Sequence, residues 1–242
     1  MTRAASAIAH CLIHKIGPSY ETMLRRALQD GFAHQTWIKA IGHTVAITVF
    51  FMAYFHVAEN PMFEVTTMPS LPLDDWTPLI ASSVWIYFSL WVYICLPASL
   101  MTTGVLLWQY FLGSLVLAVA GLWIFLLWPT QTPDWPVDWS QQPAAIRFLK
   151  NEDLSRNACP SLHVAYALFA GCWLDMMLRR VRAGRGWRWG NVFWALAIII
   201  STLTTKQHVV IDLVFGALLG GLIFAVNRNW VRRAESSTSA PR

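Results

Sequence analysis

The chain has 242 residues, of which 56% are hydrophobic and only 13% are charged, and its formal net charge is +5. Soluble domains contain about 25% charged residues, so this composition excludes an ordinary soluble globule. It is also the opposite of the polar, highly charged composition of disordered chains. The composition therefore predicts an all-α, polytopic membrane protein.

The first segment, residues 1–36, is expected to stay on one side of the membrane. Apolar residues recur in it at helical spacing, with polar residues between them: Tyr20, Met23, Leu24, Ala27 and Leu28. This pattern predicts an N-terminal amphipathic helix that lies in the membrane interface. Packing of the same helix against the rest of the protein is the alternative.

Six apolar segments follow and form a predicted membrane domain over residues 37–228. The predicted transmembrane helices lie at about 37–58, 77–97, 101–128, 160–178, 189–206 and 208–227. No Asp, Glu, Lys or Arg occurs from Trp76 to Pro133. That stretch is too long for one crossing, because about 20 apolar residues span a bilayer. The polar tail, residues 229–242, is predicted to be disordered.

The segments that connect the predicted spans divide by charge. Lys and Arg gather before the first span, between the fourth and fifth spans, and after the sixth, whereas the loop after the first span is acidic. The positive-inside rule therefore predicts a multi-pass protein of the inner or plasma membrane, with both termini in the cytoplasm. This topology explains the positive charge without nucleic acid as a partner. Nothing in the sequence indicates an oligomeric state.

Ionisable side chains are costly within a membrane, so the few that lie near the span ends are candidate functional residues. His163 is at the start of the fourth span, and Lys206, His208 and Asp212 are at the junction of the fifth and sixth. The predicted topology places both groups at the outer face. His208 and Asp212 are four residues apart, so they share a helix face on which the carboxylate can orient the imidazole.

A helix N-terminus adds to these side chains. Pro160 suits the first position of a helix, and the N–H groups that follow it, near Ser161, are expected to bind an anion. Lys206 supplies a point charge suited to phosphate. Together these groups indicate a phosphoryl-transfer site, with ordinary packing residues as the alternative. Two His and one Asp could also bind zinc, but the neighbouring ammonium would repel a metal ion, so neither a metal nor a cofactor is expected.

Two short motifs resemble signatures of the type-2 phosphatidic acid phosphatase superfamily. Residues 160–163 are Pro-Ser-Leu-His and resemble its Pro-Ser-Gly-His signature. Ser201, His208 and Asp212 match the spacing of its Ser-Arg-x5-His-x3-Asp signature. The resemblance extends over about residues 128–221 and implies a six-span fold.

Three departures narrow this resemblance. Leu162 stands in place of Gly, Thr202 stands in place of Arg, and the first signature, Lys-x6-Arg-Pro, does not occur. These changes resemble the branch that contains inositol phosphorylceramide synthases and their bacterial relatives. Residues 128–133 resemble the proline-rich signature of that branch, and Asn157 precedes the second motif in a similar way. The resemblance implies that Lys206 replaces the missing phosphate-binding Arg.

The resemblance also implies a role for each site residue. His208 attacks phosphorus and forms a phosphohistidine, which Asp212 assists by orienting the imidazole. His163 protonates the leaving oxygen and then activates the acceptor. Lys206 and Ser161 hold the phosphoryl oxygens, and no metal takes part.

The implied function is that of a lipid phosphatase that cleaves a phosphate ester or diphosphate of a lipid at the outer face. Arg147 and Lys150, in the outer loop 129–159, are further candidates for phosphate binding, with solvated loop charges as the alternative. Transfer of a phosphoalcohol from a phospholipid to a lipid alcohol is the second possibility, because the motifs are shared and only the acceptor differs. A proton-coupled transporter is the rival from another class, but the ionisable groups cluster at one mouth.

Overall fold

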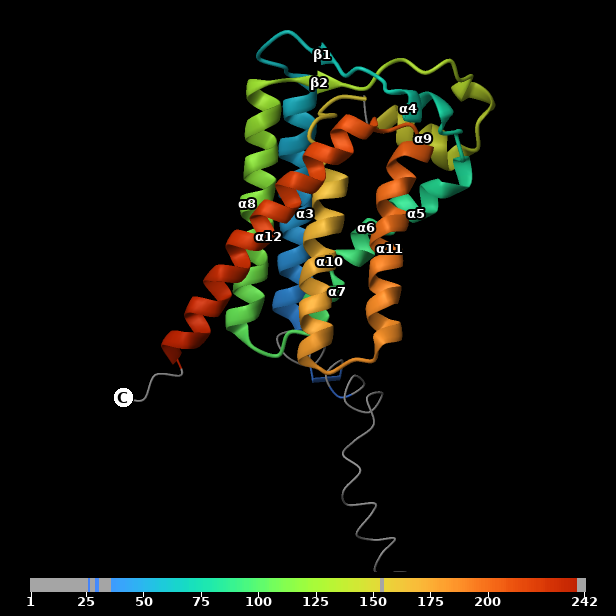
Figure 1. Ribbon diagram of the computed structural model, residues 1–242. Coiled ribbons are helices and arrows are strands. Elements are labelled where there is room, and N and C mark those ends of the chain that lie inside the picture. Colours follow the sequence, from blue (N-terminus) through green and yellow to red (C-terminus); the bar gives the residue numbers. More distant parts are fainter. Residues whose placement is uncertain (1–25, 27–28, 31–35, 153–154, 239–242) are drawn as a thin grey trace, which may run out of the picture.

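The computed structural model describes Arg26, residues 29–30, residues 36–152 and residues 155–238, with side chains described as far as Val231. The predicted amphipathic helix therefore lies almost entirely outside the described residues. Within the described part, five long helices form a bundle (Figure 1). They are α3 (Thr36–Glu59), α8 (Gly104–Leu127), α10 (Leu162–Arg180), α11 (Arg185–Thr204) and α12 (Val210–Thr238).

Three of the described helices are long and apolar enough to cross a membrane: α3, α8 and residues Val210–Val231 of α12. They coincide with the predicted spans 37–58, 101–128 and 208–227. α10 and α11 coincide with the predicted spans 160–178 and 189–206, but they are not among the three helices that are long and apolar enough to cross a membrane. The bundle also exposes large apolar side chains, for example Trp37, Trp123 and Leu218. Such a surface is unfavourable in water and suits contact with lipid, so the helices indicate a membrane protein.

The predicted second span, 77–97, is not one continuous helix. The chain forms a series of short elements there and just before it: α4 (Pro72–Trp76), the 3-10 helix η1 (Ala81–Ser83), α5 (Val84–Phe88), α6 (Leu90–Tyr93) and α7 (Leu96–Ser99). Ser83, Ser89 and Ser99 each donate a hydroxyl hydrogen bond to the carbonyl three residues earlier, at 2.7, 2.6 and 2.7 Å. Such bonds compete with the α-helical pattern, and Pro97 lacks an N–H. Both effects explain the interruption.

The predicted disordered tail also needs correction. α12 continues without a break from the membrane-length part to Thr238, so residues 229–238 are helical. Residues 239–242 lie outside the described part. Between Asn227 and Thr238 the sequence has no Gly or Pro, and Arg, Ala and Glu are good helix formers. A polar composition thus does not end a helix that has already been nucleated.

A cap of loops and short elements closes one end of the bundle. β1 (Thr66–Thr67) and β2 (Thr130–Gln131) pair in parallel, a small departure from the all-α prediction, and Gln131 also forms an antiparallel bridge with Arg156. The 3-10 helix η2 (Trp139–Gln141) and α9 (Ala144–Glu152) belong to the same region. Figure 1 shows β1, β2, α4 and α9 together at the end of the bundle opposite the α10–α11 turn.

Close packing of α10 against α12 forms the centre of the bundle. α10 is buried along most of its length, and its Trp173 donates an indole N–H to Asn227 of α12 at 3.0 Å. Two glycines of α12 lie directly on the α10 backbone: a Cβ at Gly216 would collide with the carbonyl oxygen of Ser161, and one at Gly220 with that of Ala165. The small side chains therefore permit close contact between the helices, as in other membrane bundles.

We predict that Gly220→Ala lowers the free energy of unfolding by about 1–3 kcal/mol, the usual cost of overpacking a well-packed interior. The cause is a collision with backbone, which cannot move aside as a flexible side chain can. The measurement is the thermal unfolding midpoint of the purified protein in detergent.

Gly221→Ala is the matched control, because its Cβ would be no nearer than 3.7 Å to Leu168. This substitution should be neutral or stabilise the helix by up to about 1 kcal/mol, through the better helix propensity of Ala. Equal midpoints for the two variants would contradict the proposed role of Gly220.

Candidate active site

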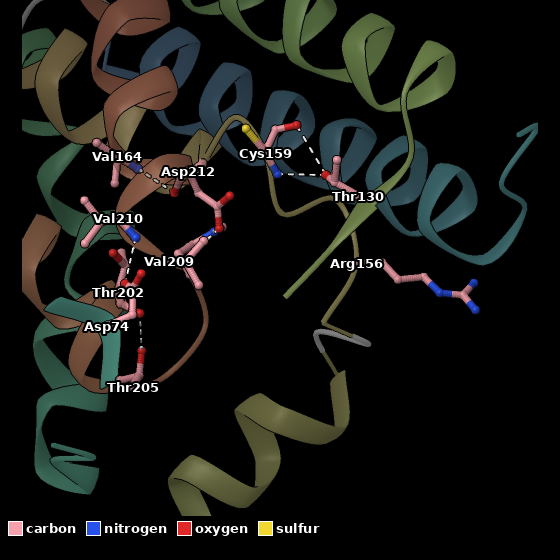
Figure 2. Close-up of polar contacts among 12 residues, drawn as sticks. Asp74, Thr130, Arg156, Cys159, Val164, Thr202, Thr205, Val209, Val210 and Asp212 are labelled. Atoms are coloured by element: carbon pink, nitrogen blue, oxygen red, sulfur yellow. Dashed lines mark hydrogen bonds and ion pairs between the residues drawn. The ribbon is translucent and has the colours of Figure 1, made fainter. Parts of the chain in front are cut away.

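His208 and Asp212 form a close pair at the capped end of the bundle. Nδ1 of His208 lies 3.4 Å from Oδ2 of Asp212, and both side chains are buried. The same Oδ2 accepts the backbone N–H of Val209 at 2.9 Å, which fixes the carboxylate at the start of α12 (Figure 2). The four-residue spacing thus places a carboxylate beside one imidazole nitrogen of His208, and His208 lines a cavity described below.

His163, in the first turn of α10, is held by Tyr87 of α5. Its Nε2 lies 3.0 Å from the carbonyl oxygen of Tyr87, and the two rings stack with centroids 3.8 Å apart. A carbonyl oxygen can only accept a hydrogen bond, so this contact assigns the proton to Nε2 and the lone pair to Nδ1. The His163 ring is therefore oriented by α5, which was predicted only as part of the second span, 77–97.

Ser161 connects α10 to α12 and caps α10. Its N–H donates to the backbone carbonyl of Asp212 at 3.0 Å, and its hydroxyl accepts the N–H of Val164 at 3.3 Å. Pro160 precedes the helix, which begins at Leu162 and not at the proline. The Ser161 hydroxyl thus has a capping role in this structure.

Lys206 lies in the turn between α11 and α12, and only 6% of its surface is exposed. Its Nζ donates to the backbone carbonyl of Asp74 at 2.7 Å and lies 4.0 Å from the ring centroid of Trp135. Burial lowers the pKa of the Lys206 ammonium, and the nearby Asp74 and Asp75 act in the opposite direction. The carbonyl of Thr202 fixes the turn by accepting the N–H groups of Gln207 and His208, at 3.1 and 3.2 Å.

Asp74, a residue of α4, was not predicted as a site residue, yet it is buried and contacts the start of α12. One carboxylate oxygen accepts the N–H of Val210 at 2.8 Å (Figure 2). The other accepts the N–H of Leu71 at 2.8 Å. The backbone carbonyl of Asp74 also accepts a hydrogen bond from Lys206. Asp74 therefore contacts residues on both sides of His208, namely Lys206 and Val210. A negative charge at a helix N-terminus is favourable, and no local pattern in the sequence reveals this long-range contact.

A cavity of about 600 Å³ opens beside the two histidines. Thr48, Asn157, His163 and His208 contribute polar side chains to its lining, and most of its remaining lining residues are apolar or aromatic residues of α3, α5, α6 and α9. Asn157 donates an amide N–H to the carbonyl of Tyr54 at 3.0 Å. The structure thus brings together His163 and His208 from the two predicted motifs and adds Asn157 to them.

The weaker phosphate-binding candidates lie outside that lining, and so do Ser161, Lys206 and Asp212. Arg147 is exposed on α9, while Lys150 contacts the hydroxyl of Ser155 and lies 5.1 Å from the ring centroid of Trp139. Arg156 points away from Asp212 and Asp74 in Figure 2 and donates to the carbonyl of Ala58 at 2.8 Å. Across the described residues, no group of three or more His, Cys, Asp or Glu is arranged to hold a metal ion.

We predict that Asp74→Asn lowers the free energy of unfolding by about 1–3 kcal/mol. An amide would place an N–H against the N–H of either Leu71 or Val210, and a buried donor without an acceptor has this cost. The thermal unfolding midpoint in detergent measures the effect. Asp75→Asn, at an exposed neighbouring position, is the control and should change the free energy of unfolding by less than about 0.5 kcal/mol. A similar change in both variants would contradict a specific role for Asp74.

One comparison with known proteins finds a match in the part of the chain that carries these residues. The family model of the PAP2 superfamily matches residues 127–236, slightly less than half of the chain, and the matched stretch contains His163, His208 and Asp212. No curated protein and no solved structure matches the chain. Members of the PAP2 superfamily are phosphatases or phosphotransferases that act on phosphate esters. The match supports the resemblance found in the sequence motifs at the level of the superfamily.

Proposed function

We propose that this protein is an integral membrane lipid phosphatase that cleaves a phosphate ester or diphosphate of a lipid through a phosphohistidine. The observation that carries the proposal is the cavity of about 600 Å³, which joins a long apolar wall to His163 and His208. A second cavity of about 270 Å³ shares Ile47, Phe50 and Trp91 with the first and continues between α3 and α8. An apolar chain fits such walls, and its phosphate would then lie at the histidines.

In the proposed first step, Nε2 of His208 attacks phosphorus, and the bond from phosphorus to the lipid oxygen breaks. Asp212, 3.4 Å from Nδ1, keeps the proton on that nitrogen and leaves the Nε2 lone pair free to attack. As positive charge develops on the imidazole, the buried carboxylate stabilises it.

His163 has the acid–base role in the proposal. Protonated at Nδ1, it gives this proton to the leaving lipid oxygen, and the neutral ring then takes a proton from the attacking water. The carbonyl of Tyr87, 3.0 Å from Nε2, holds the ring in one orientation through both steps. Hydrolysis of the phosphohistidine releases phosphate and restores His208.

Cationic and backbone donors would hold the phosphoryl oxygens, so the proposed reaction uses no metal ion. We expect the N–H groups of Leu162 and His163, in the first turn of α10, to face the phosphoryl group. Lys206 remains the candidate cation, because an ammonium has three donors and the carbonyl of Asp74 accepts one. Ser161 would act mainly by setting the position of this helix end.

The proposed location is the inner or plasma membrane, with the active site facing outward. The site lies at the capped end, whereas the α10–α11 turn, with Arg179, Arg180 and Arg185 near it, lies at the other end (Figure 1). A basic turn is typical of the cytoplasmic side. The lipid substrate would then enter from the outer leaflet.

A second candidate function is phosphoalcohol transfer to a lipid alcohol, as in inositol phosphorylceramide synthases. The two adjoining cavities support it, because together they offer space for an acceptor chain beside the donor chain. The chemistry differs in the donor, a phosphodiester that places a phosphoalcohol on His208, and in the group that His163 then activates, a lipid hydroxyl in place of water.

We predict that His208→Ala and His163→Ala each reduce phosphate release from a lipid phosphate by at least about 10³-fold, since nucleophile and acid–base contributions are of this order or larger. The assay uses purified protein in detergent micelles with phosphatidate or a polyprenyl diphosphate. Rapid quenching should trap a phosphohistidine that is absent from His208→Ala. Addition of a lipid alcohol together with a phospholipid that carries an alcohol head group, such as phosphatidylinositol, separates the two candidate functions, because only a transferase would move the phosphoalcohol to the lipid alcohol.

His56→Ala is the control, because His56 is exposed on α3 and does not line the cavity. It should retain the parental rate, and all variants should keep the parental unfolding midpoint. A fully active His208→Ala protein would overturn the mechanism.

We further predict that Ile47→Trp lowers activity toward long-chain lipid phosphates by about tenfold or more and spares a short, water-soluble phosphate ester. Ile47 lies on both cavities, so a larger ring would fill the space needed by the chain. Val45→Trp adds the same ring to an exposed position of α3 outside both linings and should leave both rates unchanged. Equal losses on long and short substrates would show that the cavity does not bind the lipid chain.

A further inference from the structure

A separate cavity of about 700 Å³ lies between α10, α11 and α12, at the end of the bundle opposite the histidines. Among the described residues it shares no lining residue with the cavity of about 600 Å³. The proposed phosphatase reaction makes no use of it.

The mouth of this cavity is positively charged. Arg179, Arg180 and Arg228 line it together with one carboxylate, that of Asp175. Asp175 is already engaged, because its two oxygens accept hydrogen bonds from Arg179 and Arg188, each at 2.7 Å. Arg179 is therefore paired within the lining, whereas Asp175 has no oxygen left for Arg228.

Arg228 is the most informative of these residues. Its Nε is buried and has no hydrogen-bond partner among the described residues. Its guanidinium carbon lies 6.0 Å from the ring centroid of Phe224, one turn earlier on α12. A buried guanidinium N–H without an acceptor is costly, and an anionic oxygen in the cavity would satisfy it.

Apart from Asn191, the rest of the lining is mainly apolar. Leu196 and Ile199 of α11 and Phe224 of α12 form part of the walls. A free phosphate ion is only a few times larger than a water molecule, which occupies about 30 Å³, so it would fill a small part of the cavity of about 700 Å³. The apolar walls would then remain in contact with water. A lipid would cover the walls with its acyl chain and place its head group at the arginines.

We propose that this cavity binds an anionic phospholipid of the leaflet at the α10–α11 turn, with the phosphate at Arg228 and Arg179 and an acyl chain along α11. The bound lipid would hold together the ends of α10, α11 and α12. This site is independent of the proposed catalytic site, since the two lie at opposite ends of the bundle and do not share residues.

The experiment measures lipid binding to the purified full chain in detergent by native mass spectrometry. Phosphatidylglycerol, phosphatidylcholine and inorganic phosphate are titrated separately, in a His208→Ala background that prevents turnover. Phosphatidylglycerol should bind and raise the unfolding midpoint, and Arg228→Gln should weaken its binding about tenfold, because one charge-assisted hydrogen bond is worth about that factor. Arg228→Lys keeps the charge and should lose less.

Arg185→Gln is the matched control, since it removes one Arg charge from an exposed position outside the cavity lining. It should bind phosphatidylglycerol as the parent does. The proposal fails if Arg228→Gln and Arg185→Gln bind phosphatidylglycerol equally, if phosphatidylcholine binds as tightly as phosphatidylglycerol, or if inorganic phosphate alone gives the full stabilisation. Binding does not require catalysis, so an inactive enzyme with intact lipid binding would contradict the proposed function only.

Discussion

The contact between α10 and α12 is the constraint on which the candidate site depends. His163 belongs to the first, while His208 and Asp212 lie just before and within the second, so the separation of the two helices sets the position of the histidines relative to each other. Gly216 and Gly220 allow the backbones to touch, and the N–H of Ser161 donates to the carbonyl of Asp212 at this contact. Glycine is unfavourable inside a helix, so its presence at these positions reflects the needs of packing.

Buried carboxylates then fix the segment that carries His208. Asp212 accepts the N–H of Val209, and Asp74 accepts the N–H of Val210 and holds Lys206 through its carbonyl. The first two contacts satisfy backbone N–H groups at the start of α12 that would otherwise be unpaired away from water. The apolar bundle supplies rigidity, and a small polar network defines where the imidazole points.

The local part of this arrangement could be predicted from the sequence, and the long-range part could not. The four-residue spacing of His208 and Asp212 fixes their shared helix face, and the apolar segments predicted α3, α8 and α12 closely. The segment 77–97 is equally apolar, but serine hydroxyls and Pro97 interrupt its helix, which hydropathy does not register. Asp74 acts 136 residues away from Val210, and in the sequence it resembles any acidic loop residue. Tyr87 is recognised only when the fold places it against His163.

The scarcity of charge gives each charged residue a position that can be explained. At the capped end, the buried groups Asp74, Asp212 and Lys206 hold the segment that carries His208. At the opposite end, Nε of Arg228 is buried and has no hydrogen-bond partner among the described residues. A bilayer offers the missing anions as lipid head groups, at the membrane surface where these arginines are expected to lie. Under the two proposals the ends differ in kind: one arranges ionisable groups for reaction, and the other leaves the Arg228 charge for a lipid head group.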